Sequence, residues 1–475
     1  MPLDERRQTP KLSAEDQIGQ WAAGLTWETV PDAPRTAARR CVLDAISVGL
    51  AGTCSPAYEA AAAAIRSLGE TSGPCTVLGS HARRSPTQAA WLNGTAIHAW
   101  DFDDTSYAGI VHATTCVLPA ALAAAQATGG TIRDVMTAYL AGVETELALG
   151  CALGNGLYSR GHWSTTALGV PGAAVAAARG LNLPASRIAQ ALRIALNLSM
   201  GMRSAHGTSA KPYLCGFASK SGVEAAWAAA SGVSAGSSTL AGKFGYADIA
   251  NGGRLDAQAF ESLGRTFRIV EPGMALKLYP ACSATQAAVQ ALLELRASHG
   301  FTAADILRIH VHGTPLVKAC LAYEAPETPT QAQFSMQFAI ATATLQGTFS
   351  IDHLNEDWIR SEAVQSLCNR IVLLQDDELV AGADLKRHPE ASRVTVVLSN
   401  GMQLERTVRS ARGMPDCPLA DEEITGKFVA CAGRIHTPEA ARALFDRLSS
   451  ADEGADARLA FDTAPQTQRN DLVHS

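Results

Sequence analysis

Small apolar residues recur at helical spacing through most of residues 14–232. In residues 35–52, alanine, cysteine and valine fall three and four positions apart, and Gly52 follows as a stop signal. Stretches of the same kind follow at 55–69, 85–100, 118–129, 131–153, 167–183 and 185–201. Because short side chains let helices approach one another closely, this pattern predicts a tightly packed helical domain with few strands.

The pattern changes after about residue 271. Residues 306–314 and 393–410 alternate apolar and polar side chains, and the second segment contains Asn400-Gly401, a two-residue hairpin signal. A third strand is predicted at 370–376, and helices are predicted at 283–298, 333–346 and 361–368. The predicted fold class is therefore mainly α, with a large all-helical domain plus a smaller α+β lid domain.

This change of pattern gives the predicted domain boundaries. Residues 1–270 are expected to form the helical domain and residues 271–410 the α+β lid domain. Residues 411–455 are again helical, and we expect them to pack back on the first domain and complete it. The charged and polar tail, residues 456–475, is expected to be disordered.

The composition argues against several classes of partner. The formal net charge is −6 and no large basic cluster occurs, which disfavours nucleic acid and anionic membranes. The N-terminal residues lack the apolar core of a secretory signal, and no stretch offers about 20 strongly apolar residues. Eleven cysteines are scattered without a CxxC pair, as expected for reduced thiols. We therefore expect a cytoplasmic protein that binds neither nucleic acid nor membranes.

Ionisable residues gather in one short stretch, NGTAIHAWDFDDTSYAGIVHATT, at residues 93–115. His98, Asp101 and Asp104 are three apart and would share a face if the helix continued, whereas Asp103 would point elsewhere. Three acids this close raise one another's pKa unless they have partners. Spacing alone leaves three interpretations open: a metal site, an acid-base cluster at a pocket floor, or a solvated helix end.

Two further segments carry polar side chains at the start of predicted helices. His162 precedes Trp163, Ser164 and Thr165, where exposed N–H groups suit an anion, although simple capping explains the hydroxyls equally well. Lys277, Tyr279 and Cys282 lie at the start of the second domain, and Cys282 has no base beside it in the sequence.

Lys211 precedes Pro212 and is expected to be held out of helix geometry, among small apolar neighbours. No GxGxxG follows a strand and no P-loop occurs, so no nucleotide cofactor is expected, and the absence of HExxH disfavours a zinc site.

Together these segments resemble the MmgE/PrpD family over roughly residues 15–450. The resemblance is sharpest in NGTAIHAWDFDDT and continues through HATTCVLPAALAAA, KPYLCGFASKSGVEAAWAAASG and KLYPACSATQAAVQA. It implies a helical domain, a smaller α+β lid, an active site between them and a homodimer. It also implies that neither a metal nor an organic cofactor is required.

The resemblance assigns roles to individual residues. The family's pocket acid falls on Asp101, the hydroxyl after it on Thr105, and the lysine of its KP pair on Lys211. The family's histidine falls on His112, although the loop before it is one residue longer here.

Several positions depart from the family pattern. Trp163 takes the place of a histidine, Leu214 stands where a histidine often follows the KP pair, and Cys282 stands where some members carry histidine. A tyrosine of the decarboxylase members aligns with Phe338, which argues against a cis-aconitate decarboxylase.

The function that the resemblance implies is a lyase for a di- or tricarboxylate, similar to 2-methylcitrate dehydratase, that removes a proton next to a carboxylate. The alternatives are an epimerase similar to that for iminodisuccinate, a cis-aconitate decarboxylase, and a non-catalytic protein that binds carboxylates. The predicted catalytic residues are Asp101, His112 and Lys211. The predicted substrate-binding residues are Thr105, His162, Ser164, Thr165, Lys277, Tyr279 and Cys282.

Overall fold

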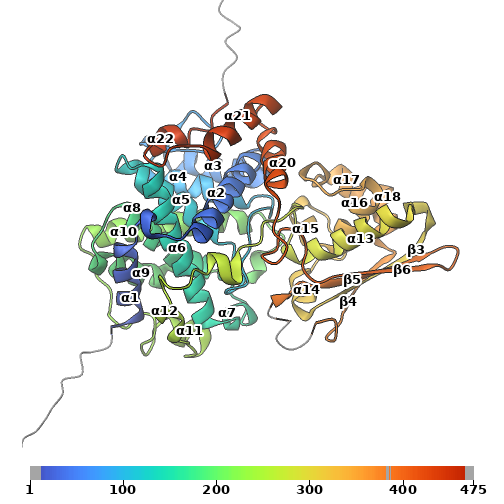
Figure 1. Cartoon of the computed structure of the whole chain (residues 1–475), viewed down its shortest axis with the longest axis horizontal. Helices are drawn as coiled ribbons and strands as arrows, with labels where there is room; N and C mark the ends of the chain where they lie inside the picture. Colours follow the sequence, from blue (N-terminus) through green and yellow to red (C-terminus); the bar gives the residue numbers. More distant parts are fainter. Residues whose placement is uncertain (1–11, 381–384, 386, 466–475) are drawn as a thin grey trace, which may run out of the picture.

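The computed structural model describes residues 12–380, 385 and 387–465. Helices dominate the chain, and a smaller part that contains the main sheet projects from one side of a larger helical part (Figure 1). The predicted fold class, mainly α with a smaller α+β part, is confirmed. No helix among the described residues has the length and apolarity that a membrane crossing requires.

Each predicted periodic stretch forms a helix, and the helical part contains further helices outside these stretches. Its helices are α1 (Ala14–Gly24), α2 (Asp32–Gly52), α3 (Pro56–Leu68), α4 (Pro86–His98), α5 (Ala113–Ala127), α6 (Ile132–Leu153), α7 (Gly156–Ser159), α8 (Ser164–Gly180), α9 (Ala185–Leu198), α10 (Ala210–Ala230), α11 (Tyr246–Asn251) and α12 (Gln258–Glu261). A two-residue hairpin, β1 (Cys75–Thr76) with β2 (Arg83–Arg84), lies between α3 and α4. Helices α5, α6, α8 and α10 pack together at the centre.

Glycine lets two of these helices lie in direct contact. Gly216 of α10 lies against α4, so close that a Cβ at this position would overlap the backbone oxygen of Trp91 and the hydroxyl of Thr95. A Cβ at Gly94 of α4 would in turn lie 2.8 Å from Cα of Gly216. The close approach expected from the small residues is therefore found between α4, which ends at the polar cluster, and α10, which begins there.

The smaller part is a four-stranded sheet with helices on it. Its helices are α13 (Gln286–His299), α14 (Pro315–Cys320), α15 (Pro329–Ala332), α16 (Met336–Gln346), α17 (Glu356–Arg360) and α18 (Glu362–Cys368). Its strands are β3 (Ile306–Gly313), β4 (Ile371–Gln375), β5 (Ser392–Leu398) and β6 (Gln403–Val408), in the order β4-β3-β5-β6. β3 and β4 are parallel, the other pairs are antiparallel, and β5 and β6 are joined at the predicted Asn400-Gly401 turn.

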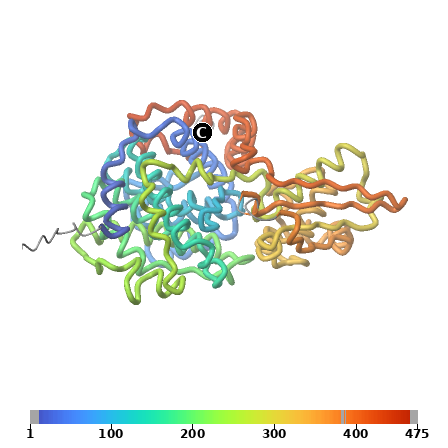
Figure 2. Tube along the Cα trace, turned by 60° about the horizontal axis from the view of Figure 1, so that its bottom comes forward, coloured from blue at the N-terminus to red at the C-terminus, as the bar shows by residue number. Residues whose placement is uncertain are grey.

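The C-terminal segment returns to the helical part. Helix α20 (Asp421–Ala432) packs on α2, α21 (Pro438–Ser449) packs on α20, and both lie along the N-terminal helices in Figure 2. α22 (Ala457–Ala460) contacts α5 and α6, and Phe461 is buried. The prediction of disorder from residue 456 onward is therefore wrong for residues 456–465, because apolar contacts hold them, and residues 466–475 lie outside the described residues.

The contact between α4 and α10 gives a stability prediction. Alanine stabilises a helix more than glycine does. Gly216→Ala is nevertheless expected to lower the free energy of unfolding by about 1–3 kcal/mol, because the added Cβ would overlap α4. Gly426→Ala is the control, since that position in α20 has open space around it and should keep or raise the midpoint of thermal unfolding. A Gly216→Ala protein that melts at or above the wild-type temperature would contradict this packing.

Candidate active site

The polar cluster forms where helix α4 ends. The helix stops at His98, and Asp101 has a backbone φ of +49°, so the chain turns away from the helix axis. Aspartate tolerates this left-handed conformation better than most residues. The predicted shared face of His98, Asp101 and Asp104 is therefore wrong, and Asp103 lies inside the cluster. All four side chains are buried, which also excludes a solvated helix end.

Asp101 lies between two buried lysines. Its Oδ2 is 2.7 Å from Nζ of Lys211, and Nζ of Lys277 donates both to its Oδ1 and, at 2.6 Å, to its backbone oxygen. Burial disfavours the carboxylate, but the two ammonium groups outweigh burial and hold the pKa of Asp101 well below its ordinary value. Burial also opposes the charge on Lys277, and the carboxylates of Asp101 and Asp103 overcome it and raise the pKa of Lys277. Asp101 and Lys277 are therefore both charged near neutral pH.

Lys211 lies within the first turn of α10, so the prediction that Pro212 holds it out of helix geometry is wrong. Proline is tolerated there because the first N–H groups of a helix have no partner within the helix. From this position the ammonium of Lys211 also donates to Nε2 of His98. The ammonium of Lys211, at the start of α10, therefore lies beside the end of α4.

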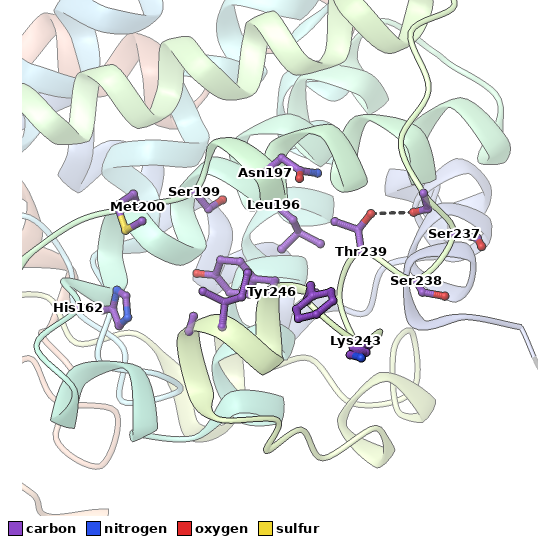
Figure 3. Close-up of a pocket in the computed structure, with 15 residues that line it drawn as sticks. His162, Leu196, Asn197, Ser199, Met200, Ser237, Ser238, Thr239, Lys243 and Tyr246 are labelled. Carbon is purple, nitrogen blue, oxygen red and sulfur yellow. Dashed lines mark hydrogen bonds between the residues drawn. The ribbon is translucent and has the colours of Figure 1, made fainter.

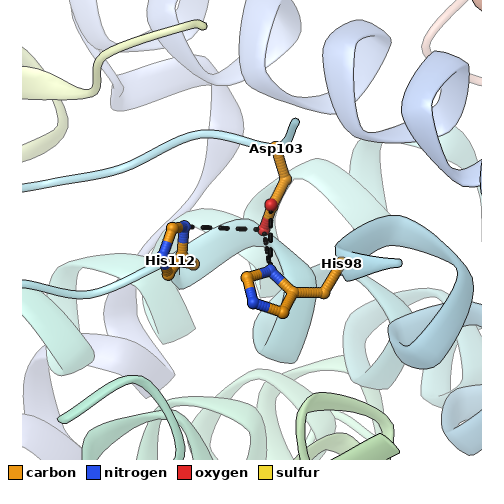
Figure 4. A group of neighbouring side chains, drawn as sticks. All are labelled: His98, Asp103 and His112. Atoms are coloured by element: carbon orange, nitrogen blue, oxygen red, sulfur yellow. Dashed lines mark hydrogen bonds and ion pairs between the residues drawn. The ribbon is translucent and has the colours of Figure 1, made fainter. Parts of the chain in front are cut away.

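Asp103 lies between two histidines (Figure 4). Both of its carboxylate oxygens are 2.9 Å from Nδ1 of His98, and Oδ2 is 3.8 Å from Nδ1 of His112. Burial raises the pKa of Asp103. Burial, together with the nearby lysine charges, lowers the pKa of both histidines well below its ordinary value. Both imidazoles are therefore neutral near pH 7.

The hydrogen bonds of His112 define its tautomer. Nδ1 is 2.9 Å from the backbone oxygen of Asp104, which can only accept, so Nδ1 carries the proton. Oγ1 of Thr105 lies 3.3 Å from the same nitrogen. Nε2 keeps its lone pair, and no residue in the described part of the chain hydrogen-bonds to it. Neutral His112 is thus suited to take a proton from a ligand.

Ser164 and Thr165 hold the loop that leads to His112. Oγ1 of Thr165 accepts from the backbone N–H of His112 at 3.1 Å, and Oγ of Ser164 donates to the backbone oxygen of Ile110 at 2.6 Å. The loop before His112, which the family resemblance implies to be one residue longer here, is therefore tied to the start of α8. The hydroxyls predicted to bind substrate are engaged in positioning the imidazole.

Asp104 points away from the lysines, toward the start of α5. It accepts from the backbone N–H of Thr114 at 3.3 Å and also from its hydroxyl, which lies 2.6 Å from the hydroxyl of Tyr139. Burial raises the pKa of Asp104 to about 7. This carboxyl group anchors the loop to α5 and α6.

His98, Asp103 and His112 offer three possible metal-ligand atoms within 4.8 Å of one another. Two features weigh against a metal there. Both nitrogens of His98 are already hydrogen-bonded, one to Asp103 and one to Lys211. The nearby ammonium groups of Lys211 and Lys277 would also repel a cation. We therefore interpret the group as an acid-base cluster.

Lys427 of α20 joins the two segments that carry Asp101 and Lys277. Its Nζ donates to the backbone oxygens of Phe102 at 2.9 Å and Lys277 at 2.8 Å, and it pairs with Asp44 of α2 at 2.7 Å. Lys427 is buried. Its sequence surroundings offered no signal for this role, since its partners are distant along the chain.

Three residues predicted to bind substrate make no hydrogen bond with the residues of this cluster, although the thiol of Cys282 lies near Asp101 and Lys277. His162 lines a pocket of about 550 Å³ together with Met200, Lys243 and Tyr246 (Figure 3), and none of the cluster residues lines that pocket. Tyr279 is half-buried, and burial raises its pKa to about 12. The thiol of Cys282 is hydrogen-bonded to that of Cys320. Neither Tyr279 nor Cys282 hydrogen-bonds to the carboxylates of the cluster.

Removing the Lys427 ammonium tests its structural role. Lys427→Met is expected to lower the free energy of unfolding by about 3–5 kcal/mol, because it leaves Asp44 buried without its cation and frees two backbone oxygens. Arg360→Met, which breaks an exposed pair with Glu356, is the control and should cost no more than about 0.5 kcal/mol. Thermal unfolding of both variants is the measurement, and equal midpoints would refute the assignment.

Comparison with known proteins identifies the family. The family model of the MmgE/PrpD N-terminal domain matches residues 16–258, and that of the MmgE/PrpD C-terminal domain matches residues 279–450. A cis-aconitate decarboxylase-like protein, oryM, of Aspergillus oryzae is 26% identical, with 94% of this chain and 96% of that protein covered. The cis-aconitate decarboxylases of Aspergillus terreus and Homo sapiens are each 25% identical, covering 90% and 84% of this chain and 90% and 83% of their own length. The chain therefore belongs to the MmgE/PrpD family.

Proposed function

We propose that the protein is a lyase for a di- or tricarboxylate and that it transfers a proton at a carbon next to a carboxylate. The observation that carries this proposal is the Lys211–Asp101–Lys277 cluster beside a neutral His112. An ammonium group has three N–H bonds. Lys211 uses two on Asp101 and His98, and Lys277 uses two on the carboxylate and the backbone oxygen of Asp101. One N–H on each lysine is left for an anionic ligand.

The chemistry follows from these donors. A carbon acid next to a carboxylate is weak, so the charge that grows on the carboxylate as the proton leaves must be stabilised. The two remaining lysine N–H groups can hold that charge, and ionised Asp101 keeps both lysines in place. Nε2 of His112 takes the proton from carbon and becomes an imidazolium beside Asp103. The proton can then return to the departing group.

Dehydration of a hydroxy acid, as in 2-methylcitrate dehydratase, is the first candidate within this class. Its first step requires a base, and His112 is neutral with a free Nε2. In this reaction the C–H proton passes to His112 and then to the leaving hydroxide, which departs as water while the C=C bond forms. Thr105, whose Oγ1 lies 3.3 Å from Nδ1 of His112, is the proposed contact for the hydroxyl or a carboxylate.

Decarboxylation is the second candidate, because the curated relatives are named as cis-aconitate decarboxylases. The sequence evidence against decarboxylation is Phe338, where the decarboxylase members carry tyrosine. Phe338 is buried in α16, and its ring contacts that of Phe349 at 5.8 Å between centroids. In decarboxylation carbon dioxide leaves first and the carbanion then needs an acid, so His112 would have to be protonated when the substrate is bound.

Product analysis in deuterated water distinguishes these reactions. The protein is incubated separately with 2-methylcitrate, citrate, cis-aconitate and iminodisuccinate, and each mixture is followed by NMR. Dehydration is expected to yield the alkene from a hydroxy acid, whereas carbon dioxide release would favour decarboxylation and deuterium incorporation without a new product would favour an epimerase. The absence of reaction and of exchange with every compound would contradict the proposal.

Two substitutions test the assigned roles. His112→Ala removes the base and Lys211→Ala removes one ammonium, and each is expected to lower kcat/KM by about 10²-fold or more on whichever compound reacts. His299→Ala, an exposed histidine at the end of α13, is the control. Near-wild-type kcat/KM in either of the first two variants would refute that residue's role.

The protonation of His112 gives a pH prediction. Because the pKa of His112 is held below its ordinary value of 6.5, lowering the pH from 8 to 6.5 should leave its ring neutral. NMR of ¹³C-labelled histidine in the ligand-free protein, assigned with His112→Gln, measures this directly. A titration midpoint at or above pH 6.5 would contradict the assignment of a neutral base.

A further inference from the structure

One partly buried histidine in the described part of the chain lies beside the cluster without taking part in its hydrogen bonds. His206 follows the short 3-10 turn Arg203–Ala205, just before α10. Its ring stacks on Phe334 with centroids 5.2 Å apart and an interplanar angle of 15°, and it meets Trp163 edge to face at 6.0 Å. Nε2 of His206 is buried and has no hydrogen-bond partner among the described residues.

Two of these rings also lie beside the Lys211 ammonium. Its Nζ lies 5.0 Å from the ring centroid of Trp163 and 5.1 Å from that of Phe334. Trp163 also lies 5.6 Å from His98, between centroids. We call Trp163, His206 and Phe334 the aromatic wall. It lies next to the lysine that has one N–H left for a ligand.

The aromatic wall is built from both parts of the chain. Trp163 is the residue before α8 and His206 precedes α10, both in the helical part. Phe334 lies between α15 and α16 of the smaller part, and its neighbour Gln333 donates to the backbone oxygen of Ala99 at 3.3 Å. The aromatic wall therefore forms beside Lys211 only when the helical part and the smaller part are in contact.

A buried nitrogen without a partner is unfavourable unless a ligand completes its hydrogen bonds. Burial lowers the pKa of His206 to about 3, with a further contribution from the charge of Lys211. The neutral ring therefore offers one N–H and one lone pair, and it does not contribute a charge. Such a group binds a carboxylate or hydroxyl oxygen through a single directed hydrogen bond.

We propose that His206 is a substrate-contacting residue that hydrogen-bonds a second carboxylate of the ligand while Lys211 and Lys277 hold the first. This inference rests on the proposed function. Within the di- and tricarboxylates of the proposed function, it favours compounds whose two carboxylates are separated by a short apolar carbon segment. That segment lies against Trp163 and Phe334, whose faces are apolar, and the polar ends reach the lysines and His206.

Citrate binding to the full-length protein, measured by isothermal titration calorimetry, tests the inference. His206→Phe keeps a ring that can stack on Phe334 but removes both nitrogens, and we expect it to raise the Kd of citrate at least tenfold. His206→Gln keeps a side-chain N–H and should bind citrate more tightly than His206→Phe. His299→Phe is the matched control and should keep the wild-type Kd.

The outcomes separate this inference from the proposed function. If Lys211→Ala loses citrate binding but His206→Phe stays within twofold of wild type, the role of His206 is overturned and the proposed function stands. If the wild-type protein binds none of citrate, 2-methylcitrate, cis-aconitate and iminodisuccinate, both fail. If His206→Phe does not fold, the test is instead made by NMR on the ¹⁵N signal of the His206 ring in the wild-type protein. A shift of that signal on citrate addition supports the contact, and an unchanged signal overturns it.

Discussion

The ion cluster of Asp101 with Lys211 and Lys277 is the interaction on which the candidate site depends. A single carboxylate between two buried ammonium groups stays ionised because their combined attraction exceeds the cost of burial. The same cluster leaves one unused N–H bond on each lysine. A buried site of this kind is suited to an anion, and the chain as a whole, with net charge −6, would not attract one.

Other buried residues hold this cluster in place. α4 and α10 pack through glycine, which brings the end of one helix to the start of the other and thereby Asp101 to Lys211. Lys427 fixes the backbone of Phe102 and of Lys277 from the opposite side. The loop before His112 is tied to α8, so that its imidazole faces the cluster with a defined tautomer. The geometry of the candidate site therefore depends on helices from the start, middle and end of the chain.

Much of the fold follows from local patterns, and the site follows only in part. Helical periodicity predicted α2 to α6, α8 and α9 within about five residues at each end, and Asn400-Gly401 predicted the β5–β6 hairpin. The stretch that holds Asp101 and His112 was evident because ionisable residues are rare around it. The turn at Asp101 was not evident from the sequence, because nothing local indicates that an aspartate will adopt a positive φ. Lys427 and His206 were missed because their partners are set by tertiary packing.

The central claim is that Lys211 and Lys277 bind a substrate carboxylate beside His112. A crystal structure with citrate bound tests it most directly. The account predicts a carboxylate oxygen within about 3.2 Å of Nζ of both lysines, with the adjacent carbon facing Nε2 of His112. Citrate bound elsewhere, for example in the pocket lined by His162 and Lys243 with the lysine cluster unchanged, would contradict it.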